Sequence, residues 1–187
     1  MKWTDEDTKY LRDFRNIIDS DDIHIKEKIK KILLGNKYIV HVLNNPKLAD
    51  SEPDEYFGVN ILPYYIVPGT QHDVQNFVCY TVGYKDRPNW DKGRKYQQIV
   101  FVILCEEKTA IDQETSLARH DLLAALITDQ FNHSNYFGEK LELVSDEEGV
   151  TDNSYVMRKL TFEQLKDNNY IKTTDGVART RNKDVVY

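Results

Sequence analysis

The residues with the clearest chemical potential are Glu106, Glu107 and Lys108, which directly follow the most apolar run of the chain. Two carboxylates beside a lysine could hold Mg²⁺ and polarise a phosphate group for attack by water. If a strand continues through these residues, its alternation places Glu106 and Lys108 on the same face, as that chemistry requires. Metal-assisted hydrolysis is therefore the first chemistry to weigh.

The other half of such a motif is much weaker. In the PD-(D/E)xK nuclease pattern a Pro-Asp pair accompanies the Glu-x-Lys sequence, and the matching residues here are Pro53 and Asp54. They lie far upstream in an acidic loop, and Asp73, at the start of an expected strand, is no better placed. A charged strand exit is common in soluble proteins. The sequence therefore predicts no catalytic residue, and a Mg²⁺-dependent nuclease using Glu106 and Lys108 remains the enzymatic alternative.

The histidines do not add a metal or catalytic site. The chain contains neither His-Glu-x-x-His, nor Cys-x-x-Cys, nor a glycine-rich phosphate loop. Ser116, His120 and Asp121 have the residue types of a triad, but neighbouring helical residues point about 100° apart, so Asp121 is not expected to orient the ring of His120. We expect no metal, no cofactor, and a His120 that is satisfied in the core or in an interface.

A strand and a helix organise the middle of the chain. Residues 96–105 contain six consecutive apolar residues rich in β-branched side chains, which predicts a strand buried on both faces. Residues 113–131 then have the spacing of a long helix. Its apolar side chains fall on two arcs, whereas an ordinary surface helix has one stripe. The first arc, which should face the sheet, contains Leu117, Leu123, Ala124, Ile127 and Phe131.

The second arc of this helix predicts an interface with another copy of the chain. It is formed by Ala118, Leu122 and Leu126, with Arg119 beside it. Because the sheet of one domain can cover only one side of a helix, we expect these four residues to contact a second subunit.

A basic hairpin tip is the second candidate contact. Residues 85–95 form a loop between two expected strands and bring Arg87 and Arg94 close to Trp90. Basic residues around an aromatic ring could touch a phosphate backbone or an acidic protein surface, although a solvated tip is equally compatible with this pattern. Since the chain has a net charge of −6, we favour a protein neighbour over DNA.

The remaining patterns complete an α+β domain with a mainly antiparallel sheet, one long helix packed on it, N-terminal helices and an extended C-terminal arm. Helices are expected at residues 4–19, 21–35 and 36–44, an edge segment at 60–68, and strands around 74–82, at 140–145 and at 153–162, with a turn at 146–149. The first helix should begin with Thr4 as its N-cap and present an apolar stripe of Tyr10, Leu11, Phe14, Ile17 and Ile18. The domain should span residues 1–165, with N-terminal helices in 4–44, a sheet-plus-helix core in 60–163, and a polar arm in 166–187.

Composition excludes several classes of protein. Hydrophobic residues make up 40% and charged residues 30% of the 187 residues, which is typical of a globular protein and not of a disordered one. No run approaches the length of a membrane span, and no signal peptide is expected because the N-terminus is acidic and polar. Cys79 and Cys105 lie within strand patterns, so we expect reduced, buried thiols.

The layout of residues 30–165 resembles the tail-terminator and neck (head–tail connector) proteins of tailed bacteriophages. The similar segments are residues 32–43, 60–68, 98–104 with 117–123, and 155–162. The resemblance implies a structural virion protein that is assembled in the host cytoplasm, forms a homo-oligomeric ring, commonly a hexamer, ends the tail tube and joins it to the neck. It also implies tail-tube and connector proteins as partners, and a lumen through which DNA passes without specific binding. Another neck or head-completion adaptor of the same connector is the alternative.

Overall fold

The structure is a computed structural model that describes residues 4–13, 21–66, 76–85, 94–151, 154–167, 170–172 and 178–180. The helices are α1 (Asp5–Asp13), α2 (Asp21–Gly35), α3 (Lys37–Leu43) and α4 (Arg119–Phe131), with short 3₁₀ helices η2 (Pro53–Tyr56) and η3 (Glu107–Thr109). The strands are β1 (Ile61–Leu62), β2 (Asn76–Lys85), β3 (Arg94–Glu106), β4 (Glu142–Thr151), β5 (Tyr155–Asp167), β6 (Tyr170–Lys172) and β7 (Ala178–Thr180).

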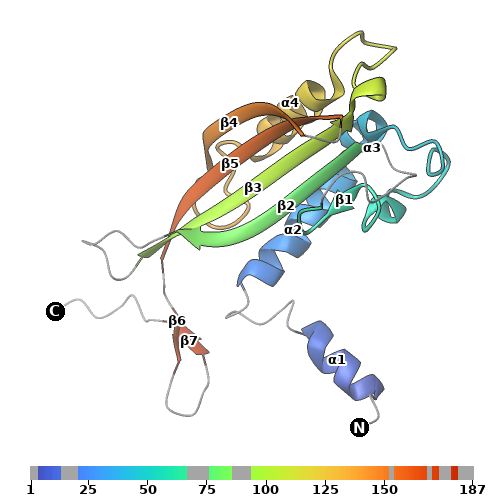
Figure 1. The fold of residues 1–187 in the computed structure, drawn as a ribbon. Helices are drawn as coiled ribbons and strands as arrows, with labels where there is room; N and C mark the ends of the chain where they lie inside the picture. Colours follow the sequence, from blue (N-terminus) through green and yellow to red (C-terminus); the bar gives the residue numbers. More distant parts are fainter. Residues whose placement is uncertain are drawn as a thin grey trace.

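Five strands form one sheet in the order β1-β2-β3-β5-β4 (Figure 1). The predicted central strand is β3, which pairs antiparallel with β2 on one side and with β5 on the other. Only the short edge strand β1 runs parallel to its neighbour, β2. The structure therefore confirms an α+β fold with a mainly antiparallel sheet.

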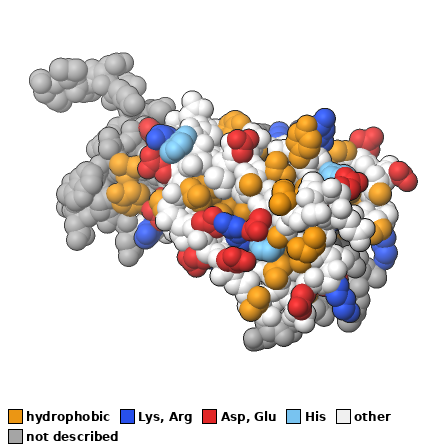
Figure 2. Space-filling view, turned by 90° about the horizontal axis from the view of Figure 1, so that it is seen from above, with side chains coloured by type: hydrophobic (Ala, Val, Ile, Leu, Met, Phe, Trp, Pro, Cys, Tyr) orange, Lys and Arg blue, Asp and Glu red, His pale blue; other side chains and the backbone are white. Residues whose placement is uncertain are grey.

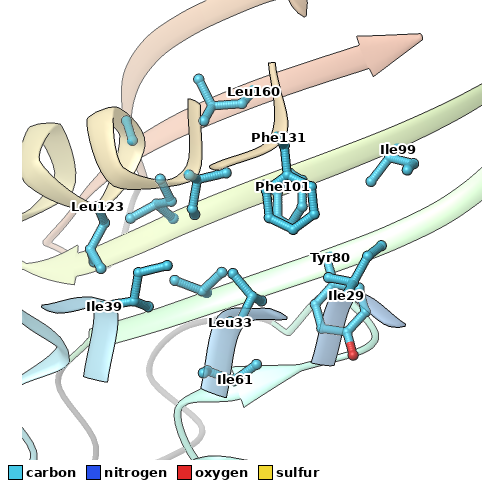
Figure 3. Packing of buried hydrophobic residues seen from close by; sticks show 14 of the residues in the cluster. Ile29, Leu33, Ile39, Ile61, Tyr80, Ile99, Phe101, Leu123, Phe131 and Leu160 are labelled. Carbon is cyan, nitrogen blue, oxygen red and sulfur yellow. The ribbon is translucent and has the colours of Figure 1, made fainter. Parts of the chain in front are cut away.

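The main core lies between one face of the sheet and helices α2, α3 and α4 (Figure 3). Alternate residues of the strands point to this face, so Tyr80 of β2, Phe101 of β3 and Phe162 of β5 are all fully buried. Ile29 of α2 and Phe131 of α4 pack against them, and the rings of Phe101 and Phe131 lie 5.0 Å apart. Burial of these large side chains supplies the main driving force for the fold.

The N-terminal helices follow their sequence signals. Asn36 caps α3, because its side chain accepts hydrogen bonds from the amides of Tyr38 and Ile39. At the start of α1, the amide of Asp7 donates to the hydroxyl of Thr4 (3.2 Å), and the amide of Thr4 donates to the carboxylate of Asp7 (2.9 Å). This reciprocal pair is a capping box. The expected continuation of α1 to residue 19 lies outside the described residues.

Three buried asparagines join the end of α3 to the sheet. Asn45 donates to the side chain of Asn60 (2.8 Å), and Asn60 donates to the carbonyl of Asn76 (2.9 Å). Asn76 in turn donates to the carbonyl of Leu43 at the end of α3 (3.0 Å). Because buried amides are costly when unpaired, this chain of hydrogen bonds fixes where the helical layer meets the β1–β2 edge.

The opposite face of the sheet carries a smaller cluster built from Leu62, Phe77, Cys79, Leu104 and Tyr155. Both cysteines are buried and free, as predicted. Burial raises the pKa of Cys79 to about 11 and that of Cys105 to about 12, so both thiols are protonated at neutral pH.

The predicted turn at residues 146–149 is wrong, because these residues belong to β4. Opposite charges across the strand pair explain the difference. Glu147 lies opposite Lys159, Glu148 lies opposite Arg158, and Asp146 forms an ion pair with Arg158. Such cross-strand pairs stabilise a sheet and here extend the strand through a sequence that is typical of turns.

The last long strand also extends further than predicted. β5 continues beyond Phe162 to Asp167, and the buried side chain of Gln164 donates to the equally buried side chain of Gln97 on β3. This hydrogen bond gives the buried Nε2 of Gln164 a partner, whereas the Oε1 of Gln164 has none among the described residues. Further along the chain, β6 and β7 form a separate two-stranded sheet. The proposed division into a domain and an arm at residue 165 stays a prediction.

Candidate assembly surface

Helix α4 begins at Arg119, six residues after the predicted start at residue 113. The preceding loop is closed by Asp112, whose carboxylate accepts hydrogen bonds from the amide (2.9 Å) and the hydroxyl (2.7 Å) of Thr115. Ser116 has φ +59°, and the amide of Asp112 donates to the carbonyl of Leu117. Leu117 is consequently 53% exposed and does not belong to the core arc of the helix.

Arg119 is buried at the start of α4. Its guanidinium lies 2.8 Å from the carboxylate of Asp112 and donates to the carbonyls of Thr109 and Val42, each at 3.0 Å. The side chain of Arg119 is 8% exposed and that of Asp112 is 6% exposed. The hydrogen bonds from Thr115 lower the pKa of Asp112, so the carboxylate is charged at neutral pH. Arg119 thus joins α3, the loop and α4 of its own chain, and its predicted contact with a second copy stays a prediction.

The other predicted interface residues lie on or beside α4. Ala118 is its half-buried N-cap and forms a bridge with Ile111. Leu122 and Leu126 are half-buried and pack against the core of their own chain. Part of the second apolar arc is therefore covered within the subunit. The exposed Ala125 lies between the two leucines, and together these three residues form the outward ridge of α4.

A groove runs beside this ridge, where the end of α2 and the start of α3 meet α4. It has a volume of about 680 Å³. Its apolar lining comes from Ile32, Tyr38 and Leu126, and Tyr38 is 59% exposed. Lys31 and Lys37 give the groove two cations, whereas Asp129 contributes one carboxylate. An apolar floor with a basic rim is suited to an acidic, amphipathic partner.

On the other side of α4, a charged cluster is centred on Arg158 of β5. Two nitrogens of its guanidinium donate to the two carboxylate oxygens of Asp146 on β4, each at 2.8 Å, and a third donates to Asp121 of α4. This bidentate contact lowers the pKa of Asp146 and raises that of Arg158. Figure 2, which views the molecule from above, shows acidic and basic side chains gathered beside a histidine near the middle of this face. The cluster joins β4, β5 and α4.

His120 borders the charged cluster and is 6% exposed. Its Nε2 lies 3.4 Å from a carboxylate oxygen of Glu148 and 3.6 Å from one of Asp121. The ring therefore lies closer to Asp121 than its position on the helical wheel predicts, although 3.6 Å is too long for a hydrogen bond. Ser116, the third residue of the imagined triad, lies in the exposed loop before the helix. The predicted burial of His120 is confirmed. The ring is not fully satisfied as predicted, because its buried Nδ1 has no hydrogen-bond partner among the described residues.

The Glu-x-Lys motif does not have the geometry that motivated it. β3 ends at Glu106, and Lys108 lies on the 3₁₀ helix η3, so strand alternation does not place the two side chains together. Pro53 and Asp54 are exposed at the start of the 3₁₀ helix η2. Among the residues that the structure describes, no group of three His, Cys, Asp or Glu side chains could hold a metal ion. Asp73 lies outside that part of the chain.

The predicted contact at the hairpin tip is not testable in this structure. Arg87 and Trp90 lie outside the described residues, and Arg94 is described only as the first backbone position of β3. At the base of the same hairpin, Lys85 lies 3.1 Å from the carboxylate of Glu163 on β5. A role for Arg87, Trp90 and Arg94 stays a prediction.

Sequence reasoning missed the groove and the Arg158 cluster. The cluster had a signal, because the basic pair Arg158 and Lys159 lies in the expected strand at 153–162, and the acidic residues of 146–148 lie in the segment that joins it to the strand before it. The groove had none, since its lining residues come from three helices whose packing is set by the core. Within the described ranges, no helix is long and apolar enough to cross a membrane.

Comparison with known proteins yields one family and a weak structural likeness. A family model described as YomW matches residues 21–164, which is well over half of the chain. A chain of the solved structure titled "Virion of native gene transfer agent (GTA) particle" has 13% sequence identity and a TM-score of 0.40. That match covers 59% of this chain and 80% of the other. No curated protein matches. On the family match, this chain belongs to the YomW family.

Proposed function

We propose that this protein is a structural component of a tailed-phage virion, forming a ring that ends the tail tube and joins it to the neck. The sequence layout of residues 30–165 suggests the class. The observation that carries the proposal is the outward ridge of α4, where Leu122, Ala125 and Leu126 reach the surface next to an open groove. An apolar ridge beside a concave surface is what a repeated contact between identical subunits requires.

Charge fits this role as well. A net charge of −6 disfavours binding to the DNA backbone, so a ring of such subunits would let DNA pass through its lumen. The mechanism is assembly rather than a reaction. The ring, a hexamer in this proposal, stops tube polymerisation because only one of its sides resembles the end of the tube. Its partners are the tail-tube protein on that side and neck proteins on the other, and the subunits assemble in the host cytoplasm before joining the virion.

The proposal can be tested by the native mass of the purified full chain, measured over a range of concentrations and in the presence of isolated tail tubes. Ala125→Arg places a charge on the ridge at an exposed position, so it should block assembly without unfolding the subunit. Ala49→Arg is a matched control, because Ala49 is also exposed but lies in the loop after α3. Wild type and control should form one closed oligomer that the ridge variant does not form.

The proposed function would be contradicted if the chain remained monomeric at high concentration and also failed to bind tail tubes. Equal assembly of both variants would instead move the interface away from α4.

A further inference from the structure

Helix α1 has an acidic first turn and exposed apolar side chains near its other end. It is held in shape by its capping box, and its first turn contains the three carboxylates of Asp5, Glu6 and Asp7. Near its other end, Leu11 is 51% exposed and Tyr10 is 64% exposed. α1 thus combines an acidic end with an apolar patch that its own chain leaves largely open to solvent. A short amphipathic helix with such a patch is suited to binding in a groove.

The position of α1 keeps this patch away from the groove of the same chain. In Figure 1, α1 lies apart from the sheet, beyond the N-terminal end of α2. The α2 residues that line the groove, Lys31, Ile32 and Gly35, lie at the other end of that helix. Since α2 has 15 residues and a helix rises 1.5 Å per residue, the two ends are about 20 Å apart. Helix α1 of a neighbouring subunit is not held at this distance, so it can reach the groove.

The groove and α1 are complementary in charge and polarity. Lys31 and Lys37 line the groove, and the ammonium group of Lys37 lies 5.0 Å from the centre of the Tyr38 ring. The half-buried Ile32 and Leu126 provide an apolar floor. An incoming helix with an acidic first turn would meet the lysines, while its apolar patch would cover Tyr38 and the floor. Asp129 is the single carboxylate on the rim.

We propose that the groove binds α1 of a second copy of the chain, so that neighbouring subunits exchange their N-terminal helices. This inference rests on the proposed self-assembly and names the segment that forms it. Each contact is small, but in a closed ring every subunit both gives and receives a helix, and the contacts then act together. The exchange also gives a role to Leu126, which is only half-buried and lines the groove.

Disulfide trapping between full-length variants tests the exchange. One preparation carries Leu11→Cys and the other Tyr38→Cys, and the two are mixed under mild oxidation. Because each variant contains only one exposed cysteine among the described residues, with Cys79 and Cys105 buried, a mixed disulfide reports contact between two chains. The matched control mixes Leu11→Cys with Ala49→Cys. We expect a covalent dimer from the first pair and only background from the control pair.

The native mass of each mixture separates failure of the exchange from failure of the proposed function. Closed oligomers without the Leu11–Tyr38 link would overturn the exchange but leave the ring intact. Absence of both would overturn both. A double variant Leu11→Cys/Tyr38→Cys that links only within one chain, while the mixed single variants do not link, would show that α1 binds its own groove and would also contradict the exchange.

Charge reversal supplies a second readout. Lys31→Glu with Lys37→Glu should slow the trapping reaction by about two- to fivefold per lost ion pair, as exposed ion pairs contribute modestly. Reversal of the partner helix by Asp5→Lys with Glu6→Lys should restore the rate in the mixture. A rate that is unaffected by the lysine variants, or that the helix variants do not restore, would contradict the assigned docking geometry.

Discussion

Two arginine–aspartate pairs lie on opposite sides of α4, and they differ in burial and in what they connect. Arg119 and Asp112 have side chains that are 8% and 6% exposed. The guanidinium of Arg119 contacts the carboxylate of Asp112 and the carbonyls of Thr109 and Val42, in the surrounding loop and α3. In the second pair, the side chains of Arg158 and Asp146 are 27% and 34% exposed. Arg158 also reaches Asp121, which is half exposed.

The difference in burial indicates which ion pair fixes the fold and which one responds to solvent and salt. A buried ion pair is costly to break, because the remaining partner becomes an uncompensated charge. An ion pair near the surface is partly compensated by water and by salt. The pair at Arg119 therefore fixes where α4 begins, whereas the cluster at Arg158 holds β4 beside α4 and still offers charge to the surface.

The largest effect is expected from Arg119→Met. This change leaves Asp112 without its cation and removes the donors to Thr109 and Val42. The free energy of unfolding should fall by about 3–5 kcal/mol, as for other broken buried pairs. Urea denaturation followed by far-UV circular dichroism measures it. The double variant with Asp112→Asn should lose less than the sum of the two single variants, and additive losses would mean that the two residues are not coupled.

A smaller effect is expected from Arg158→Met. The bidentate contact with Asp146 and the contact with Asp121 should together contribute about 1 kcal/mol, because these side chains are partly exposed. The same denaturation experiment should be done at low and at high salt. High salt should reduce the difference in the free energy of unfolding between wild type and Arg158→Met, but it should leave the difference for Arg119→Met nearly unchanged. If salt reduced both differences equally, the two ion pairs would not differ in their exposure to solvent screening.

The smallest effect is expected on the stability of the protein at low pH. The hydrogen bond with Arg158 lowers the pKa of Asp146, and the hydrogen bonds from Thr115 lower that of Asp112. A carboxyl group with a lowered pKa in the folded state stabilises the protein above its unfolded pKa of about 3.9, and this stabilisation is lost as the pH falls through the folded value. Stability should therefore decline below about pH 4, and less steeply in Asp146→Asn. If the stability of Asp146→Asn fell as steeply below pH 4 as that of wild type, Asp146 would not contribute to the decline.

Local signals predicted much of the fold. α2 and α3 have the expected bounds, with Asn36 as the cap between them, because capping and periodicity depend only on neighbouring residues. The apolar run of β3 likewise predicted a strand that is buried on both faces. The start of α4 and the extent of β4 could not be predicted in the same way. They depend on contacts between distant residues, such as Arg119 with Val42 and Arg158 with Asp146.

The candidate surface was only partly predictable for the same reason. Periodicity identified Leu122 and Leu126, but it could not tell that both would pack partly against the core of their own chain. The groove beside them is formed by residues from α2, α3 and α4, so it exists only once these helices pack on the sheet.

The proposed ring at one end of a phage tail can be tested directly by electron microscopy of purified tails that have been incubated with the full-length protein, labelled by gold at a C-terminal affinity tag. We expect a closed ring at a single end of each tail, absent with Ala125→Arg and retained with Ala49→Arg. Label along the tube, label at both ends, or no association of any variant with tails would contradict it.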